Sequence, residues 1–162
     1  MTKRVAPHDS SWSRWFEEEA ARLRPAFGPA LVALHHVGST AIPGILAKPV
    51  IDILVEAVSL VAIDERASAM RALGYEVMGE YGIQGRRYFK RKGASGAPGF
   101  HVHAYEAGSE DVRRHLAFRD YLLAHADEAQ AYSALKASLA DENGLLVDDY
   151  QERKSNFVRR AM

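Results

Sequence analysis

Asp52 is the one charged residue inside an otherwise apolar run, Val50 to Val55. A carboxylate in a buried strand is costly unless it is paired, hydrogen-bonded or bound to a metal ion. Two interpretations of Asp52 therefore stand side by side. It either caps a turn at the end of a strand, or it forms the polar centre of a cleft and serves as a metal ligand or proton-transfer group.

A Gly-Ser-Thr sequence, Gly38-Ser39-Thr40, follows an earlier apolar run over 31–37. A strand that ends in Gly-Ser turns sharply, so that backbone N–H groups and hydroxyls can face an anion. A plain turn is the alternative. The chain returns through Lys48 to the Asp52 run after a short connection. We therefore expect the two strand ends to lie side by side, with Ser39 near Asp52.

Two histidines, His101 and His103, flank one residue in a run that alternates like a strand. A spacing of two places both imidazoles on the same face. Such a pair can bind a divalent metal or move protons, or it can be one solvated face of an edge strand. His35 and His36 are adjacent, so they should face opposite sides and cannot chelate one ion together.

Basic residues recur on the apolar stripes of three expected C-terminal helices. The first stripe contains Val112, Leu116 and Leu123 together with a basic residue. The basic residues of the three stripes are Arg119, Lys136 and Lys154. Each alone could extend its long side chain to water. Together they suggest a polar cleft whose cations face phosphate or carboxylate groups.

The segment Arg86 to Lys92 is the most basic stretch, and it contains Arg87, a further candidate for phosphate contact. As a strand, it would place residues 86, 88, 90 and 92 on one face. Mixed basic and aromatic residues can bind nucleic acid, but an exposed edge strand protected by charge is the favoured interpretation. The chain has 21 basic and 21 acidic residues. A nucleic-acid partner is therefore not expected.

Periodicity and turn residues predict the elements that must position these groups. We expect strands over 31–37, 50–55, 75–81, 86–92 and 100–105. Helices are expected over 10–27, 60–73 and 147–160, from near Ser109, and from near Asp127, where Gln130 could complete a capping box. Strands and helices do not alternate strictly, so the fold class is α+β, in a single domain over 1–162 with a helical C-terminal third.

The chain contains no cysteine, which excludes disulfides and thiolate metal sites. Its N-terminus lacks the apolar region of a secretory signal. No apolar run approaches the ~20 residues of a membrane helix. We expect a cytoplasmic protein with no membrane partner.

The motifs resemble those of the GrpB family over nearly the whole chain. The first block is His35-His36-Val37-Gly38-Ser39-Thr40-Ala41-Ile42-Pro43-Gly44, followed by Ala47-Lys48-Pro49-Val50-Ile51-Asp52-Ile53; later blocks include Gly85-Arg86-Arg87-Tyr88-Phe89, His101-Val102-His103 and Phe118-Arg119-Asp120-Tyr121-Leu122. The family is similar to the nucleotidyltransferase superfamily. The resemblance thus implies a bacterial protein with a nucleotidyltransferase-like mixed β-sheet flanked by helices.

In that superfamily a Gly-Ser turn holds a triphosphate, and carboxylates on neighbouring strands bind Mg²⁺. Gly38, Ser39 and Asp52 match this pattern, but the second carboxylate position holds Leu54. The strand expected to carry a third acid holds histidines instead. Glu56 lies four residues along the Asp52 strand, about 13 Å away, so it should not share a metal ion with Asp52. Two-metal chemistry is therefore in doubt.

The resulting hypothesis is a domain that binds a nucleotide or a phosphorylated small molecule, and that transfers a nucleotidyl group with Mg²⁺ or Mn²⁺ if catalysis is retained. Asp52 and His103 would be catalytic, and a metal would be held by Asp52, His101 and His103. The phosphate contacts would come from Gly38, Ser39, Thr40, Lys48, Arg87, Arg119, Lys136 and Lys154. The alternative is a non-catalytic module that binds the same ligand or supports a partner enzyme, since a related domain is fused to dephospho-CoA kinase in some bacteria.

Overall fold

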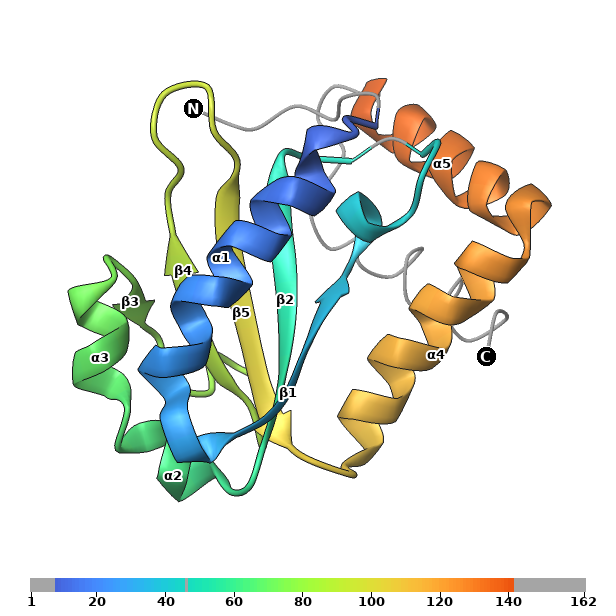
Figure 1. The fold of residues 1–162 in the computed structure, drawn as a ribbon. Coiled ribbons are helices and arrows are strands. Elements are labelled where there is room, and N and C mark those ends of the chain that lie inside the picture. Colours follow the sequence, from blue (N-terminus) through green and yellow to red (C-terminus); the bar gives the residue numbers. More distant parts are fainter. Residues whose placement is uncertain (1–7, 46, 142–162) are drawn as a thin grey trace.

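The computed structural model describes residues 8–45 and 47–141, and a five-stranded sheet forms its centre (Figure 1). The strands are β1 (Leu31–Val37), β2 (Val50–Ala57), β3 (Glu76–Val77), β4 (Arg87–Arg91) and β5 (Gly99–Glu106). Their order across the sheet is β1-β2-β5-β4-β3. Only the central pair, β2 and β5, is parallel, so the sheet is mixed.

Helices flank this sheet, which confirms the predicted α+β fold. They are α1 (Ser11–Phe27), α2 (Leu60–Asp64), α3 (Ala67–Ala72), α4 (Glu110–Ala124) and α5 (Ala126–Asp141). Figure 1 shows α1 crossing one face of the sheet, with α4 and α5 beside the β1 end. No helix of the described ranges is long and apolar enough to cross a membrane.

Several predicted elements differ in extent from the observed ones. The helix expected over 60–73 is two short helices, because the chain leaves helical geometry at Arg66 (φ −100°, ψ 8°). The strand expected over 75–81 pairs as β3 over only two residues. The capping box is absent because α5 begins at Ala126, which places Asp127 inside the first turn rather than at the N-cap. Gln130 instead donates to the Gly44 carbonyl oxygen at 3.3 Å. The helix expected over 147–160 lies outside the described residues.

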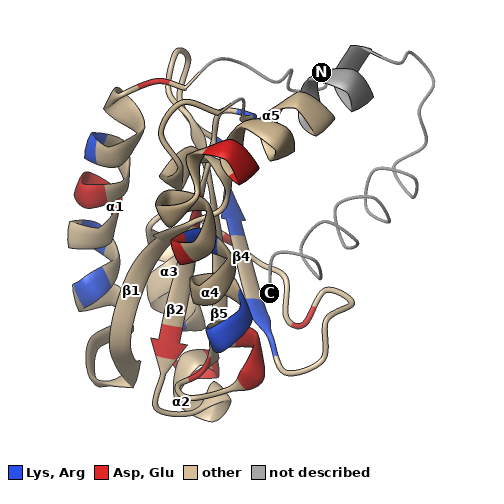
Figure 2. Cartoon of the chain, turned by 90° about the vertical axis from the view of Figure 1, so that its right-hand side faces the viewer, with Lys and Arg blue, Asp and Glu red and all other residues tan. Residues whose placement is uncertain are grey.

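The basic strand β4 is not an edge strand, so that interpretation was wrong. It lies between β5 and β3 in the strand order, and Figure 2 shows blue segments along it. Its two arginines are engaged with the protein, since Arg87 binds Asp64 at 2.7 Å and Arg91 binds Glu19 at 2.9 Å. A continuous basic ribbon for nucleic acid is therefore not available on this strand.

Strand parity separates an apolar face from a polar face. On the α1 side, Ile51, Ile53 and Val55 of β2 are fully buried against a core that includes Leu23 and Phe27 of α1. The alternate residues of β2 point to the other side, which α4 covers only in part. The partly covered face is the one that carries Asp52.

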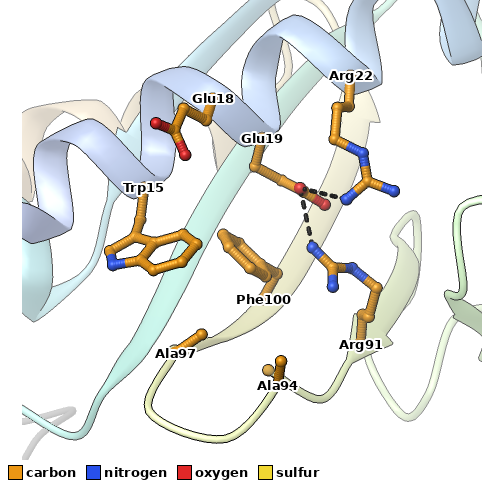
Figure 3. A pocket seen from close by; sticks show the side chains of 9 residues that line it. Trp15, Glu18, Glu19, Arg22, Arg91, Ala94, Ala97 and Phe100 are labelled. Atoms are coloured by element: carbon orange, nitrogen blue, oxygen red, sulfur yellow. Dashed lines mark hydrogen bonds and ion pairs between the residues drawn. The ribbon is translucent and has the colours of Figure 1, made fainter.

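Glu19 is a buried carboxylate within the otherwise apolar face of α1, 3% exposed. It binds Arg22 at 3.0 Å and Arg91 at 2.9 Å, and accepts a hydrogen bond from the Tyr75 hydroxyl at 2.5 Å. Burial raises the pKa of Tyr75, so its hydroxyl stays a donor. Figure 3 shows the two arginines reaching Glu19 beside a cavity of about 190 Å³. These contacts fasten α1 to β4.

We predict that Glu19→Ala lowers the free energy of unfolding by about 3 kcal/mol, because it leaves Arg91 and Tyr75 without their buried acceptor. Urea denaturation at pH 7 measures this loss. The matched control is Glu18→Ala, which removes an exposed carboxylate from the next position of the same helix and should change stability by less than about 0.5 kcal/mol. Equal effects of the two substitutions would contradict this account.

His36 of β1 packs against α1, with its ring stacked on Phe16 at a centroid distance of 4.8 Å. Its Nε2 lies 2.9 Å from Thr40 Oγ1. Burial lowers the pKa of His36 from 6.5 to about 4, with Asp52 acting in the opposite direction and Arg119 in the same one. Between these two pH values the unfolded chain binds a proton that the folded chain does not.

We therefore predict that the free energy of unfolding falls as pH decreases from about 6.5 to about 4, by up to about 3 kcal/mol at ~1.4 kcal/mol per pKa unit. In His36→Gln this part of the pH dependence should be missing, since glutamine does not titrate and can still bond to Thr40. Urea denaturation at a series of pH values measures both proteins. Identical slopes over this interval would show that His36 is not responsible.

Candidate functional site

Asp52 and Gly38 are in direct contact at the ends of β2 and β1. The pairing of the two strands places Val37 opposite Asp52, and Gly38 follows with φ +75°, a conformation that favours glycine. A Cβ on Gly38 would lie 2.6 Å from Asp52 Oδ2. Glycine is therefore required here for two reasons, its backbone conformation and the carboxylate that occupies the place of a side chain.

A chain of contacts orients the Asp52 carboxylate. His103 Nε2 lies 3.1 Å from Asp52 Oδ1, and its Nδ1 lies 3.3 Å from Arg86 Nη1. A guanidinium has no acceptor, so Nδ1 of His103 must accept and Nε2–H must donate to the carboxylate. Arg86 thus holds His103 as the neutral tautomer that donates to Asp52. This arrangement directs an N–H donor at the Asp52 carboxylate.

Arg86 is itself fixed by the loop before β4. It is 7% exposed and donates to the carbonyl oxygens of Tyr81 at 2.9 Å and Glu80 at 3.2 Å. Its guanidinium lies over the ring of Tyr88, 4.6 Å from the centroid. Burial, and to a smaller extent the charge of Asp52, raise the pKa of Tyr88, so its hydroxyl stays protonated.

His101 lies at the margin of this cluster, with Nδ1 3.9 Å from Asp52 Oδ1. On the α4 side, the ring of His115 lies 6.1 Å from that of His103. No three His, Asp or Glu side chains within the described ranges converge as a metal site requires. One carboxylate with two imidazoles is also not the oxygen-rich set that Mg²⁺ or Mn²⁺ prefers. The expected ion therefore does not fit these side chains as they lie.

Leu54 occupies the place where the resemblance implies a second carboxylate, and it is fully buried. It packs in an apolar cluster with Val37, Tyr105 and Val112, which joins the sheet to α4. Glu56, further along the same face, lies 2.5 Å from His35. Leu54 is thus a packing residue under α4, and Glu56 is engaged away from Asp52.

The structure places three predicted phosphate contacts near the strand ends. Thr40 is buried, and its hydroxyl bonds to His36 rather than facing outward. Lys48 is exposed, two residues before β2. Arg119 of α4 donates to the His36 carbonyl oxygen at 3.3 Å and pairs with Asp120 at 2.9 Å. Arg119 therefore lies beside the end of β1, and Lys48 lies before the start of β2.

Arg87 and Leu123 do not join the site. Arg87 lies on the α1 side of the sheet, where it binds Asp64. Leu123, expected on the buried stripe of α4, is 51% exposed, and Leu122 is buried instead. The side chain of Lys136 and the whole of Lys154 lie outside the described residues.

Sequence reasoning missed Arg86, Tyr88 and His115 as site residues. The alternation 86, 88, 90 already placed Arg86 and Tyr88 on one strand face, and antiparallel pairing sets Tyr88 opposite His103. That alternation could have indicated that Arg86, rather than Arg87, faces the site. His115 had no comparable signal, because its position depends on how α4 packs over β5.

Comparison with known proteins identifies relatives over nearly the whole chain. The family model described as GrpB protein matches residues 2–162. The UPF0157 protein YqkA of Bacillus subtilis is 42% identical over 95% of this chain, which spans 44% of that protein's length. A dephospho-CoA kinase of Mycolicibacterium paratuberculosis is 31% identical over 98% of this chain, which again spans 44% of the longer protein.

A solved structure agrees with the fold. The crystal structure of conserved protein GrpB from Enterococcus faecalis superposes with a TM-score of 0.86 at 33% sequence identity, covering 97% of this chain and 96% of that one. The sheet and helices described above are therefore shared with a protein of the same name as the matching family model. The chain belongs to the GrpB family.

Proposed function

We propose that the face around Asp52 binds a nucleotide or another phosphorylated small molecule. The observation that carries this proposal is the contact between Asp52 and Gly38, which brings the carboxylate to the Gly-Ser turn. Asp52 is 30% exposed, so a ligand can reach it. His103 and Arg86 already fix its orientation before any ligand arrives.

Different groups on this face would bind the phosphate and the hydroxyl of the ligand. A phosphate suits the Gly38-Ser39 turn together with the nearby cations Lys48 and Lys90, of which Lys90 lies opposite His101. Asp52 repels phosphate but accepts a hydrogen bond from a sugar hydroxyl well. The ligand class that uses both halves carries a phosphate and a hydroxyl a short distance apart, as nucleotides do.

A second candidate, a non-catalytic binding module, is favoured by the burial of Leu54. Transfer of a nucleotidyl group by paired divalent ions needs a group of carboxylates that the described residues of this face do not present. A relative named dephospho-CoA kinase contains a segment like this chain within a longer protein. A module that binds a nucleotide for a partner enzyme fits both facts, and dephospho-CoA is a reasonable probe for it.

We predict that wild type binds ATP or dephospho-CoA in isothermal titration calorimetry. Asp52→Ala should weaken binding at least tenfold, because a hydrogen bond to a charged acceptor contributes about 1.5–3 kcal/mol. Inorganic triphosphate, which has no sugar hydroxyl, should bind Asp52→Ala at least as tightly as wild type, because the substitution removes a carboxylate that repels phosphate. Titrations with and without Mg²⁺ or Mn²⁺ test the role of a metal separately.

The control is Glu56→Ala, which removes a carboxylate from the same strand and the same face. Glu56 pairs with His35 and does not contact Asp52. The dissociation constants of this variant for ATP and dephospho-CoA should stay within about twofold of the wild-type values, because charges away from the ligand contribute little. No binding by wild type, or unchanged binding by Asp52→Ala, would contradict the proposal.

For the second candidate, we predict that Leu54→Asp does not create a transferase. Burying a carboxylate in the cluster under α4 should lower the free energy of unfolding by at least about 3 kcal/mol. Leu54→Met, which conserves volume, should cost less than about 1.5 kcal/mol. Urea denaturation and pyrophosphate release from ATP are the measurements. A stable Leu54→Asp protein that releases pyrophosphate would instead point to an enzyme that has lost one ligand.

A further inference from the structure

The loop between β3 and β4 holds an exposed tyrosine in an unusual backbone conformation. Tyr81 has φ +46°, and within the described ranges it is the single non-glycine residue with positive φ. Such strain persists where surrounding contacts impose it, and it is common at ligand-binding sites. Tyr81 is also 59% exposed, although its large ring would favour burial.

The contacts that impose this conformation also build the Asp52 site. Arg86 donates to the Tyr81 carbonyl oxygen and approaches His103 with its other terminal nitrogen. The side chain of Glu80 accepts from the backbone N–H of Gly85 at 2.8 Å, which closes the loop. The same guanidinium therefore sets the position of Tyr81 and the tautomer of His103.

A row of stacked rings leads from Tyr81 to Asp52. The Tyr81 ring stacks on Tyr88 at a centroid distance of 5.5 Å and an interplanar angle of 23°. Tyr88 stacks in turn on His103 at 5.2 Å and 30°. His103 ends the row at the carboxylate of Asp52. Tyr81 is thus the outer member of this row, with one ring face on Tyr88 and much of its surface accessible.

We propose that Tyr81 is a stacking platform for a planar ring of the ligand, so that the ligand class is a nucleotide rather than a sugar phosphate or an inorganic phosphate. This inference rests on the proposed function, because it assumes that phosphate binds near Gly38-Ser39. A tyrosine ring offers a flat, apolar surface to any base, so the contact would favour nucleotides without selecting strongly among them.

The experiment compares ATP with inorganic triphosphate, which lacks the planar ring, in calorimetric titrations of four proteins. Wild type should bind ATP about tenfold or more tightly than triphosphate, as base stacking on an aromatic side chain implies. Tyr81→Asn should lose the part of that preference that stacking supplies, about fivefold or more, keep the part that comes from the sugar hydroxyl on Asp52, and keep its triphosphate affinity. Asparagine tolerates positive φ, so the loop should retain its conformation.

Two further variants make the result specific. Tyr81→Phe keeps the ring and should keep the preference for ATP. Ile83→Asn removes an exposed apolar side chain from the same loop, 41% exposed, and should behave like wild type. Melting temperatures within a few degrees of wild type would show that the loop variants are folded.

Three outcomes would overturn the inference, and they separate it from the proposed function. If wild type binds triphosphate and ATP equally, phosphate binding stands, and both the platform and the hydrogen bond from a sugar hydroxyl to Asp52 are refuted. If Tyr81→Asn retains the preference for ATP, the ring contact lies elsewhere. If neither probe binds wild type, the proposed function fails and this inference fails with it.

Discussion

The contact between the Asp52 carboxylate and the backbone of Gly38 is the constraint on which the site depends. It joins two segments that are separated by the whole 39–49 connection, and it is possible only because no side chain stands at position 38. The carboxylate lies where two strands end, at a point that α4 leaves partly open. A charge within the sheet is tolerable there because the Asp52 side chain is 30% exposed and His103 contacts its carboxylate. The other side chains of the polar face are arranged around this carboxylate.

The two faces of the sheet accommodate a carboxylate in different ways. On the α1 face, Glu19 is enclosed by Arg22, Arg91 and Tyr75, and the charges are balanced within the protein. On the α4 face, Asp52 is held by a neutral imidazole and stays accessible. The cavity of about 190 Å³ lies beside Glu19, whose carboxylate is already satisfied. Accessible, oriented charge rather than cavity size is therefore the reason for proposing the Asp52 face as the ligand-binding face.

Much of the fold could be predicted from the sequence, because apolar periodicity and turn residues are local signals. The strand over 31–37 is β1 itself, and the expected first helix differs from α1 by one residue at its start. The wrong predictions concern features that tertiary contacts determine, such as strand pairing and the burial of charged side chains. Whether β4 is an edge depends on the pairing of the two-residue strand β3, which carries almost no signal of its own. The burial of Glu19 had no local signal, because its partners Arg91 and Tyr75 come from distant segments. The proximity of Gly38 to Asp52 followed from a short connection, whereas the contact of Arg86 with His103 needed the register between β4 and β5.

The parallel pairing of β2 with β5 has a consequence for how this chain can vary in length. Its register sets Asp52 opposite His101 and Leu54 opposite His103, so the site consists of alternate residues from adjacent strands. Inserting or deleting a single residue within either strand would exchange the polar and apolar faces beyond that point. Changes in length should therefore be confined to the loops, such as 93–98 between β4 and β5. Homologous chains can differ freely there while their strand interiors keep the same count of residues.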